Sequence, residues 1–217
     1  MPEAAENPGR RALLLGGAWL LVAVTIGLAP LLGRWLPSPA AVLALGAVYW
    51  SGCWTLALLA GDRSALAALY RTPIHRRPVE LILTWLPVVA TLVVGFLPSV
   101  SRVPLPVLAA VVGVALVNGV TEELFWRGAF VSRFPGSLKL GLLFPLLPFT
   151  AWHLALALMP GVRYEGGIPA LLGGAAFFGV CWGWTVWRTH DLRSATLAHV
   201  LTNTFAFTQL ALVNWVA

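Results

Sequence analysis

The stretch that decides the fold is VPLPVLAAVVGVALVNGVTEELFWRGAF, residues 103–130. Its first part, residues 103–119, is almost wholly apolar, and it is followed directly by Glu122, Glu123 and Arg127. Crossing the hydrocarbon core of a bilayer takes about 20 mostly apolar residues. The stretch therefore predicts a membrane-spanning helix that carries charged side chains, which are expensive in a membrane and mark functional sites by default.

Six further apolar runs surround this one. The chain has 217 residues, of which 59% are hydrophobic and only 10% are charged, whereas soluble domains average about 25% charged residues. The runs are continuous instead of alternating with period two, so they predict helices and not barrel strands. We expect an all-α polytopic transmembrane bundle of about seven helices, forming a single membrane domain over residues 1–217, with spans at 12–33, 39–60, 79–98, 104–130, 138–159, 168–187 and 195–216.

The net charge is +6, but the basic residues do not form a nucleic-acid-binding stripe. They lie singly or in pairs at the ends of apolar runs, a pattern typical of membrane topology. With the N-terminus in the cytoplasm, eleven of the fourteen basic residues lie inside, so the positive-inside rule predicts that orientation. Thirteen of the fourteen are arginine, which favours a bacterial protein in the inner membrane.

Two breaks between the apolar runs carry local structure. Residues 61–80, GDRSALAALYRTPIHRRPVE, predict either a short amphipathic helix on the inner leaflet, with Arg76 and Arg77 near anionic headgroups, or a plain basic loop. Pro145 and Pro148 interrupt the fifth apolar run. They predict a kinked or re-entrant segment near 138–148, because irregular backbone is tolerated in a membrane only where protein or a wet cavity satisfies it.

The charged cluster has an internal geometry that follows from helical spacing. Residues four apart share a helical face, so Glu123 and Arg127 can pair, while Glu122 points elsewhere and is free. Asn118 lies four residues before Glu122 and could donate a hydrogen bond to it, or could instead join two helices. Taken alone, the cluster could also be the charged end of an ordinary spanning helix.

Two later runs place further polar side chains at the same spacing. Phe149 and His153 are four residues apart, as are His199 and Asn203. A carboxylate can take a proton from water, an imidazole can orient that water or protonate a leaving amine, and an amide can stabilise an oxyanion. The alternative is a metal site, because Glu122, His153 and His199 form a plausible Zn²⁺ ligand set. Neither an HExxH nor a Gly-x-Ser-x-Gly motif is present.

Glu-Glu-x-x-x-Arg, Phe-x-x-x-His and His-x-x-x-Asn, in this order and in successive apolar runs, resemble the signature of the CAAX protease and bacteriocin-processing (CPBP, or ABI) family of intramembrane endopeptidases. The resemblance covers about residues 104–216, which would be the catalytic core. It implies a membrane-associated peptide or protein tail as substrate, a lipid bilayer as surroundings and no nucleic-acid partner. A glutamate mechanism without a cofactor is favoured, and zinc stays open.

The resemblance also implies roles for individual residues. Glu122 would activate water, Glu123 would support it and Arg127 would hold the charges of the helix. His153 and His199 would position the water or bind a metal, and Asn203 would stabilise the oxyanion. The side chains shaping the substrate pocket would be Phe149 and Trp126.

Two other functions are compatible with buried ionisable residues. They are a small proton-coupled transporter and a non-catalytic scaffold or immunity protein.

The peptidase hypothesis sets a geometric condition on His153 and Glu122. An unbroken helix would put His153 roughly 20 Å from Lys139, while Glu122 lies near the inner end of its span, so we expect residues 138–148 to fold back and bring His153 within about 10 Å of Glu122.

Overall fold

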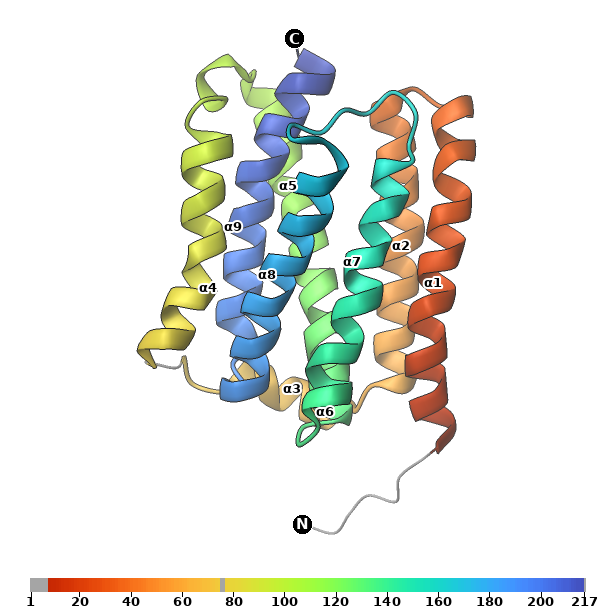
Figure 1. Ribbon diagram of the computed structural model, residues 1–217, viewed down its shortest axis with the longest axis vertical. Coiled ribbons are helices and arrows are strands. Elements are labelled where there is room, and N and C mark those ends of the chain that lie inside the picture. The colour runs from red at the N-terminus through yellow and green to blue at the C-terminus, as the bar shows by residue number, and fades with distance from the viewer. Residues whose placement is uncertain (1–7, 75–76, 217) are drawn as a thin grey trace.

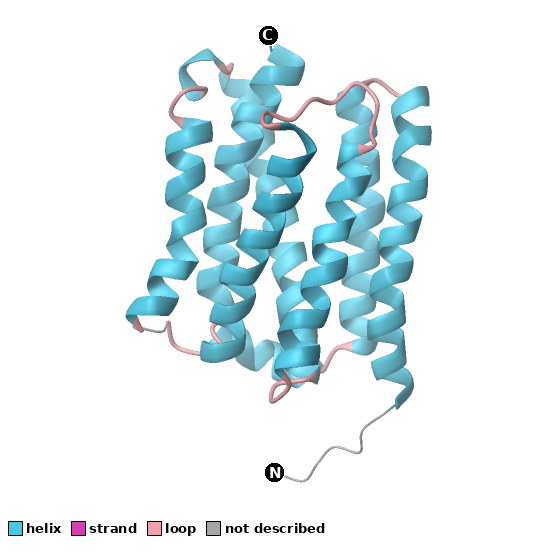
Figure 2. Cartoon of the chain, in the orientation of Figure 1, coloured by secondary structure: helices cyan, strands magenta, loops and turns pink. Residues whose placement is uncertain are grey.

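The computed structural model describes residues 8–74 and 77–216, and over these residues the seven predicted spans are confirmed. The spans stand side by side as a helical bundle (Figure 1). The described residues form helices and loops without a strand (Figure 2). The spans are α1 (Pro8–Trp35), α2 (Ser38–Ala60), α4 (Pro78–Thr91) with η1 (Leu92–Phe96), α5 (Leu105–Glu122) with η3 (Glu123–Ala129) and α6 (Phe130–Arg133), η4 (Lys139–Leu143) with α7 (Phe144–Ala157), α8 (Gly167–Thr189), and α9 (Leu192–Ala211) with η5 (Leu212–Val216).

Local sequence explains where several helices begin. A proline lies in the first turn of α2, α4 and α5, where a missing backbone N–H does no harm. Asp191 caps α9 by accepting a hydrogen bond from the backbone nitrogen of Ser194. Asp62 caps α3 (Arg63–Arg71) in the same way, through Ser64 and Ala65. These caps satisfy amide groups that the helix itself cannot.

The short helix α3 confirms the amphipathic reading of the longest polar break. Leu66 and Leu69 are buried under the bundle, while Arg63 and Arg71 are exposed. Figure 1 shows α3 lying across the end of the bundle at which α1 begins. Arg76, for which the sequence predicts a contact with lipid headgroups, lies outside the described residues.

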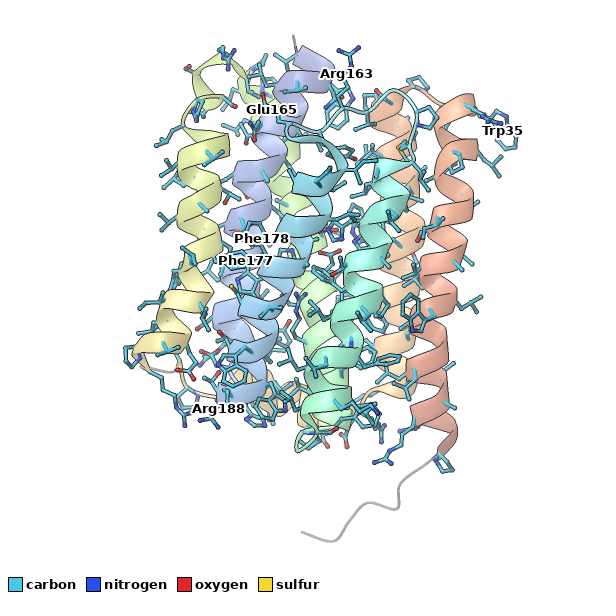
Figure 3. The ribbon with its side chains drawn as sticks, viewed as in Figure 1. Trp35, Arg163, Glu165, Phe177, Phe178 and Arg188 are labelled. Atoms are coloured by element: carbon cyan, nitrogen blue, oxygen red, sulfur yellow. The ribbon has the colours of Figure 1, made fainter. Side chains whose placement is uncertain are left out.

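The two ends of the bundle differ in charge. Arg188 lies at the end that holds α3 and the start of α1, whereas Arg163 and Trp35 lie at the opposite end (Figure 3). Arg133, Lys139 and Arg193 bound spans at the first end as well. This basic end is the one that the positive-inside rule assigns to the cytoplasm.

The predicted fold-back of residues 138–148 is wrong. The irregular backbone is a π-helical stretch, η4, that continues into α7, and the two together form one span. Local π-type adjustments re-satisfy backbone groups that a proline leaves unpaired in a membrane helix, and η4 lies directly before Pro145 and Pro148.

The fold-back is unnecessary because Glu122 lies deeper than its position in the sequence suggested. Its helical span continues to Arg133, eleven residues further on. At a rise of 1.5 Å per residue, Glu122 is about 16 Å from that end of the span. His153 interacts electrostatically with Glu122 from a continuous helical span.

Candidate active site

A close approach of α5 and α9 builds the site. A Cβ atom added at Gly119 would lie 2.9 Å from the backbone nitrogen of Val200, a distance that real Cβ contacts do not show. Small residues let membrane helices approach closely, so Gly119 lets the end of α5 press against α9. The next turn of α5 then presents Glu122 and Glu123 to His199.

His199 lies between the two carboxylates. Its Nδ1 atom is 2.8 Å from Oε1 of Glu123, and its Nε2 atom is 3.2 Å from Oε2 of Glu122. All three residues are at most 3% exposed. The indole ring of Trp182 stacks on the imidazole, with 4.3 Å between ring centroids, and so holds the ring in this plane.

The protons of this cluster can be counted. A nitrogen–oxygen contact of this length needs one hydrogen, so the two contacts of His199 need two. Either His199 is an imidazolium between two carboxylates, or it is neutral and one glutamate is protonated. In both cases the three groups carry a net charge of about −1, which the guanidinium of Arg127 balances. The cluster is therefore neutral as a whole, as burial in a membrane requires.

The predicted pair of Glu123 and Arg127 is confirmed. Nη1 of Arg127 lies 3.0 Å from Oε1 of Glu123, and the two side chains are 4% and 0% exposed. The guanidinium also lies 4.2 Å from the centroid of the Phe149 ring, a cation–π contact. Glu123 and Arg127 both belong to the π-helical stretch η3. Such π-helical irregularities occur frequently at functional sites.

Glu122 is not free, contrary to the expectation from helical spacing. The predicted hydrogen bond from Asn118 is present, with Nδ2 at 3.1 Å from Oε2. A second donor comes from α2, where the hydroxyl of Tyr49 lies 2.8 Å from Oε1. Helical spacing describes neighbours on the same helix only, and both Tyr49 and His199 approach from other helices.

His153 lies on α7 with one ring nitrogen engaged. Its Nδ1 atom is 2.9 Å from the carbonyl oxygen of Phe149. A carbonyl only accepts, so Nδ1 carries the hydrogen and Nε2 of the neutral ring is an acceptor. The side chain is partly exposed and interacts electrostatically with Glu122. The predicted stacking of Phe149 and His153 is confirmed as an edge-to-face contact with 5.2 Å between centroids.

Asn203 follows His199 by one turn on α9. It is 8% exposed, and its Nδ2 atom has no hydrogen-bond partner among the described residues. A buried amide nitrogen without a hydrogen-bond partner is unfavourable. The Nδ2 group of Asn203 is therefore available to donate to an acceptor on a bound molecule. The hydroxyl of the adjacent Thr202 is buried and unpaired as well.

A small cavity lies beside the charged cluster. Its lining includes Trp126, Arg127 and Phe149, together with residues of η4, α7 and α8: Gly141, Leu142, Pro145, Leu146, Gly179 and Gly183. The two side chains assigned to the substrate pocket therefore face a common space. Trp126 has a second contact, since its indole nitrogen donates to the Tyr49 hydroxyl at 2.6 Å.

The structure tests the fit of the zinc ligand set. Glu122 and His199 lie close together, and His199 is backed by Glu123, as metal-binding histidines commonly are. Among the described residues, however, no group of three or more His, Cys, Asp or Glu side chains could hold a metal ion. Glu122, His153 and His199 thus do not fit a three-ligand zinc site in this arrangement.

Residues 104–205 match the family model described as Type II CAAX prenyl endopeptidase Rce1-like. Over these residues the chain is similar to the CAAX protease family. No curated protein and no solved structure gives a match. The matched range contains every residue of the three motifs, from Glu122 to Asn203. With its seven apolar spans, this CAAX protease relative is a multi-pass membrane protein.

Sequence reasoning missed the contribution of α2, which lies before the range that matches the CAAX protease family. Besides Tyr49, this helix contributes Trp50 and Trp54, whose indole nitrogens donate to Asn118 and Thr121. Aromatic residues are common in membrane helices, and nothing in their spacing distinguishes these three. The only available signal was that Tyr49 is the single tyrosine within the second apolar run.

Proposed function

We propose that this protein is an intramembrane endopeptidase that uses water activated by Glu122. Its substrates would be membrane-associated peptides or protein tails, cut near the cytoplasmic face. The CAAX protease family supports a peptidase in general terms. The observation that carries the specific proposal is the contact of Glu122 with His199, two buried side chains 3.2 Å apart on different helices.

In the first step, Glu122 would accept a proton from a water molecule while the water oxygen attacks the scissile carbonyl carbon. The donors Tyr49 and Asn118 stabilise the carboxylate form that this step needs. His153 would hold the water through its Nε2 atom, since Nδ1 is occupied by the Phe149 carbonyl. A positioned carboxylate and imidazole are a common general-base pair.

In the second step, the carbonyl oxygen carries a negative charge in the tetrahedral intermediate. The unpaired Nδ2 group of Asn203 would donate to this oxygen, as a preorganised oxyanion donor. The intermediate then collapses, the carbon–nitrogen bond breaks, and the proton taken up by Glu122 passes to the leaving amine. Water has been added across the peptide bond, and Glu122 is an anion again.

The depth of Glu122 supports a substrate that enters from the basic end of the bundle. Glu122 is eleven residues from Arg133 at that end and seventeen residues from Leu105 at the other. These separations correspond to about 16 Å and about 26 Å along a helix. If the basic end faces the cytoplasm, as proposed for a bacterial inner-membrane protein, the substrate tail enters from the cytoplasmic side.

Cleavage of a membrane-anchored peptide in liposomes tests this function. Purified wild type should release a product whose mass identifies one peptide bond, and Glu122→Gln should release none. Glu80→Gln is a matched control, because Glu80 is also buried, at 7% exposure, but lies on α4 and outside the three motifs. Equal cleavage by wild type and Glu122→Gln would contradict the proposal, and absence of cleavage by both proteins would favour a scaffold. Proton-coupled uptake without cleavage would favour a transporter.

A further inference from the structure

Three side chains of α2 donate hydrogen bonds to consecutive turns of α5. The hydroxyl of Tyr49 bonds to Glu122, the indole nitrogen of Trp50 bonds to Asn118 at 2.8 Å, and the indole nitrogen of Trp54 bonds to Thr121 at 3.0 Å. Two of these bonds, from Tyr49 and Trp50, lead to the Glu122 carboxylate, and the third does not.

The direction of the Tyr49 hydrogen bond follows from its neighbour. A hydroxyl can donate or accept, but an indole N–H can only donate. Nε1 of Trp126 lies 2.6 Å from the Tyr49 oxygen, so this oxygen accepts from Trp126. Its single hydrogen is then left for Oε1 of Glu122. The ring is held in place by Trp152, which stacks on it at 3.7 Å with an angle of 7° between the planes.

The orientation of the Asn118 amide follows in the same way. The oxygen and nitrogen of an amide are interchangeable by a flip, and only their partners determine which way round they lie. Trp50 donates and cannot accept, so it selects the amide oxygen of Asn118. The amide nitrogen of Asn118 is thereby turned toward Oε2 of Glu122, 3.1 Å away.

We infer that α2 is a positioning element for Glu122, with Tyr49 and Trp50 as positioning residues. Tyr49 acts directly on one carboxylate oxygen, and Trp50 acts through Asn118 on the other. Both donors keep the carboxylate in one rotamer, so that its reactive face stays toward the water. This inference rests on the proposed function, and it adds residues from a helix outside the range matched by the family.

Paired substitutions test the inference, since α2 supplies its own control. Trp50→Phe and Trp54→Phe each remove one indole N–H bond between the same two helices, but only Trp50 leads to Glu122. Tyr49→Phe is matched by Tyr164→Phe, whose hydroxyl donates to the Leu156 carbonyl away from the site. We expect Tyr49→Phe and Trp50→Phe to lower kcat by about ten- to a hundredfold with little change in KM. Tyr49→Phe removes a hydrogen bond to the Glu122 carboxylate, and Trp50→Phe frees the Asn118 amide that donates to the same carboxylate. Trp54→Phe and Tyr164→Phe should retain kcat within about twofold.

An infrared measurement keeps the inference testable if a variant is poorly active for another reason. The carboxyl band of Glu122 is identified as the difference between wild type and Glu122→Gln. It should shift in Tyr49→Phe and stay unchanged in Tyr164→Phe. If Trp50→Phe and Trp54→Phe lose the same activity and the band does not move, the inference is overturned. The proposed function fails separately, if Glu122→Gln itself remains active.

Discussion

His199 and Glu122 are in contact across 77 positions of sequence, with Nε2 of the imidazole 3.2 Å from Oε2 of the carboxylate. The other imidazole nitrogen faces Glu123 at 2.8 Å. One histidine thus joins two neighbouring carboxylates whose own helix points them in different directions. This arrangement lets a single ring couple the proposed base to the buried Glu123–Arg127 pair.

His199→Asn should lower kcat by at least about a hundredfold while the protein stays folded. The shorter asparagine side chain can keep a donor near Glu123, but it cannot reach Glu122. His190→Asn is a suitable control, because His190 is exposed and has a left-handed backbone with φ of 57°, which asparagine tolerates. Peptide cleavage in liposomes measures both variants, and unchanged activity of His199→Asn would remove this contact from the mechanism.

Asn203→Ala should reduce kcat by about a hundred- to a thousandfold, the usual effect of losing one oxyanion donor. The variant should be as stable as wild type in thermal unfolding, because the lost Nδ2 group is unpaired in the resting protein. Thr202→Val removes the neighbouring unpaired hydroxyl and should leave the cleavage rate unchanged. If Asn203→Ala instead unfolds at a lower temperature and cleaves normally, Asn203 is a structural residue.

Arg127→Met should lower the free energy of unfolding by about 3 kcal/mol or more, since it leaves the buried charge of Glu123 without its partner. The double variant Arg127→Met/Glu123→Gln should lose less than the sum of the two single losses. Denaturant unfolding in detergent measures all three, with Arg188→Met as the control at an exposed arginine. Additive losses would show that the pair is not coupled.

Much of this architecture could be predicted from local sequence. The seven spans follow from apolar runs, and the Glu123–Arg127 and Asn118–Glu122 contacts follow from a spacing of four residues on one helix. The contacts of Glu122 with Tyr49 and His199 depend on how separate helices pack, which no single run of sequence records. Packing here depends on Gly119, whose importance is visible only when Val200 is found against it.

The one wrong expectation about the backbone has a similar origin. Pro145 and Pro148 predict a break in the helix, because proline usually interrupts a helix in water. In a membrane helix, π-type turns can absorb the missing hydrogen bonds, and η4 lies directly before the two prolines within one continuous span. Sequence also placed Glu122 too close to the end of its span, because the predicted span ends at residue 130 and the helix continues to Arg133.

The interfacial helix α3 should depend on pH through its cap. Hydrogen bonds from the backbone of Ala65 and the side chain of Ser64 lower the pKa of Asp62. Its stabilising contribution is therefore complete above the unfolded pKa, about 3.9, and is lost as the pH falls through the lower folded value.

Hydrogen exchange of α3 measures this effect. Asp62→Ala should destabilise the helix by about 1 kcal/mol at neutral pH. Asp62→Asn keeps a cap that does not titrate. In wild type, protection of α3 against exchange should fall in acid as Asp62 is protonated, and in Asp62→Asn this fall should be absent. Protection of α3 in wild type that persists below the folded pKa of Asp62 would contradict this role of the cap.

The most direct test of the central claim is the single-turnover cleavage rate of a membrane-anchored peptide, measured for wild type and Glu122→Gln before and after dialysis against a chelator. If Glu122 activates the water by itself, chelation leaves the wild-type rate unchanged and Glu122→Gln lowers it by about ten-thousandfold or more. A wild-type rate that disappears with chelation and returns with Zn²⁺, or a Glu122→Gln rate close to that of wild type, would contradict the account.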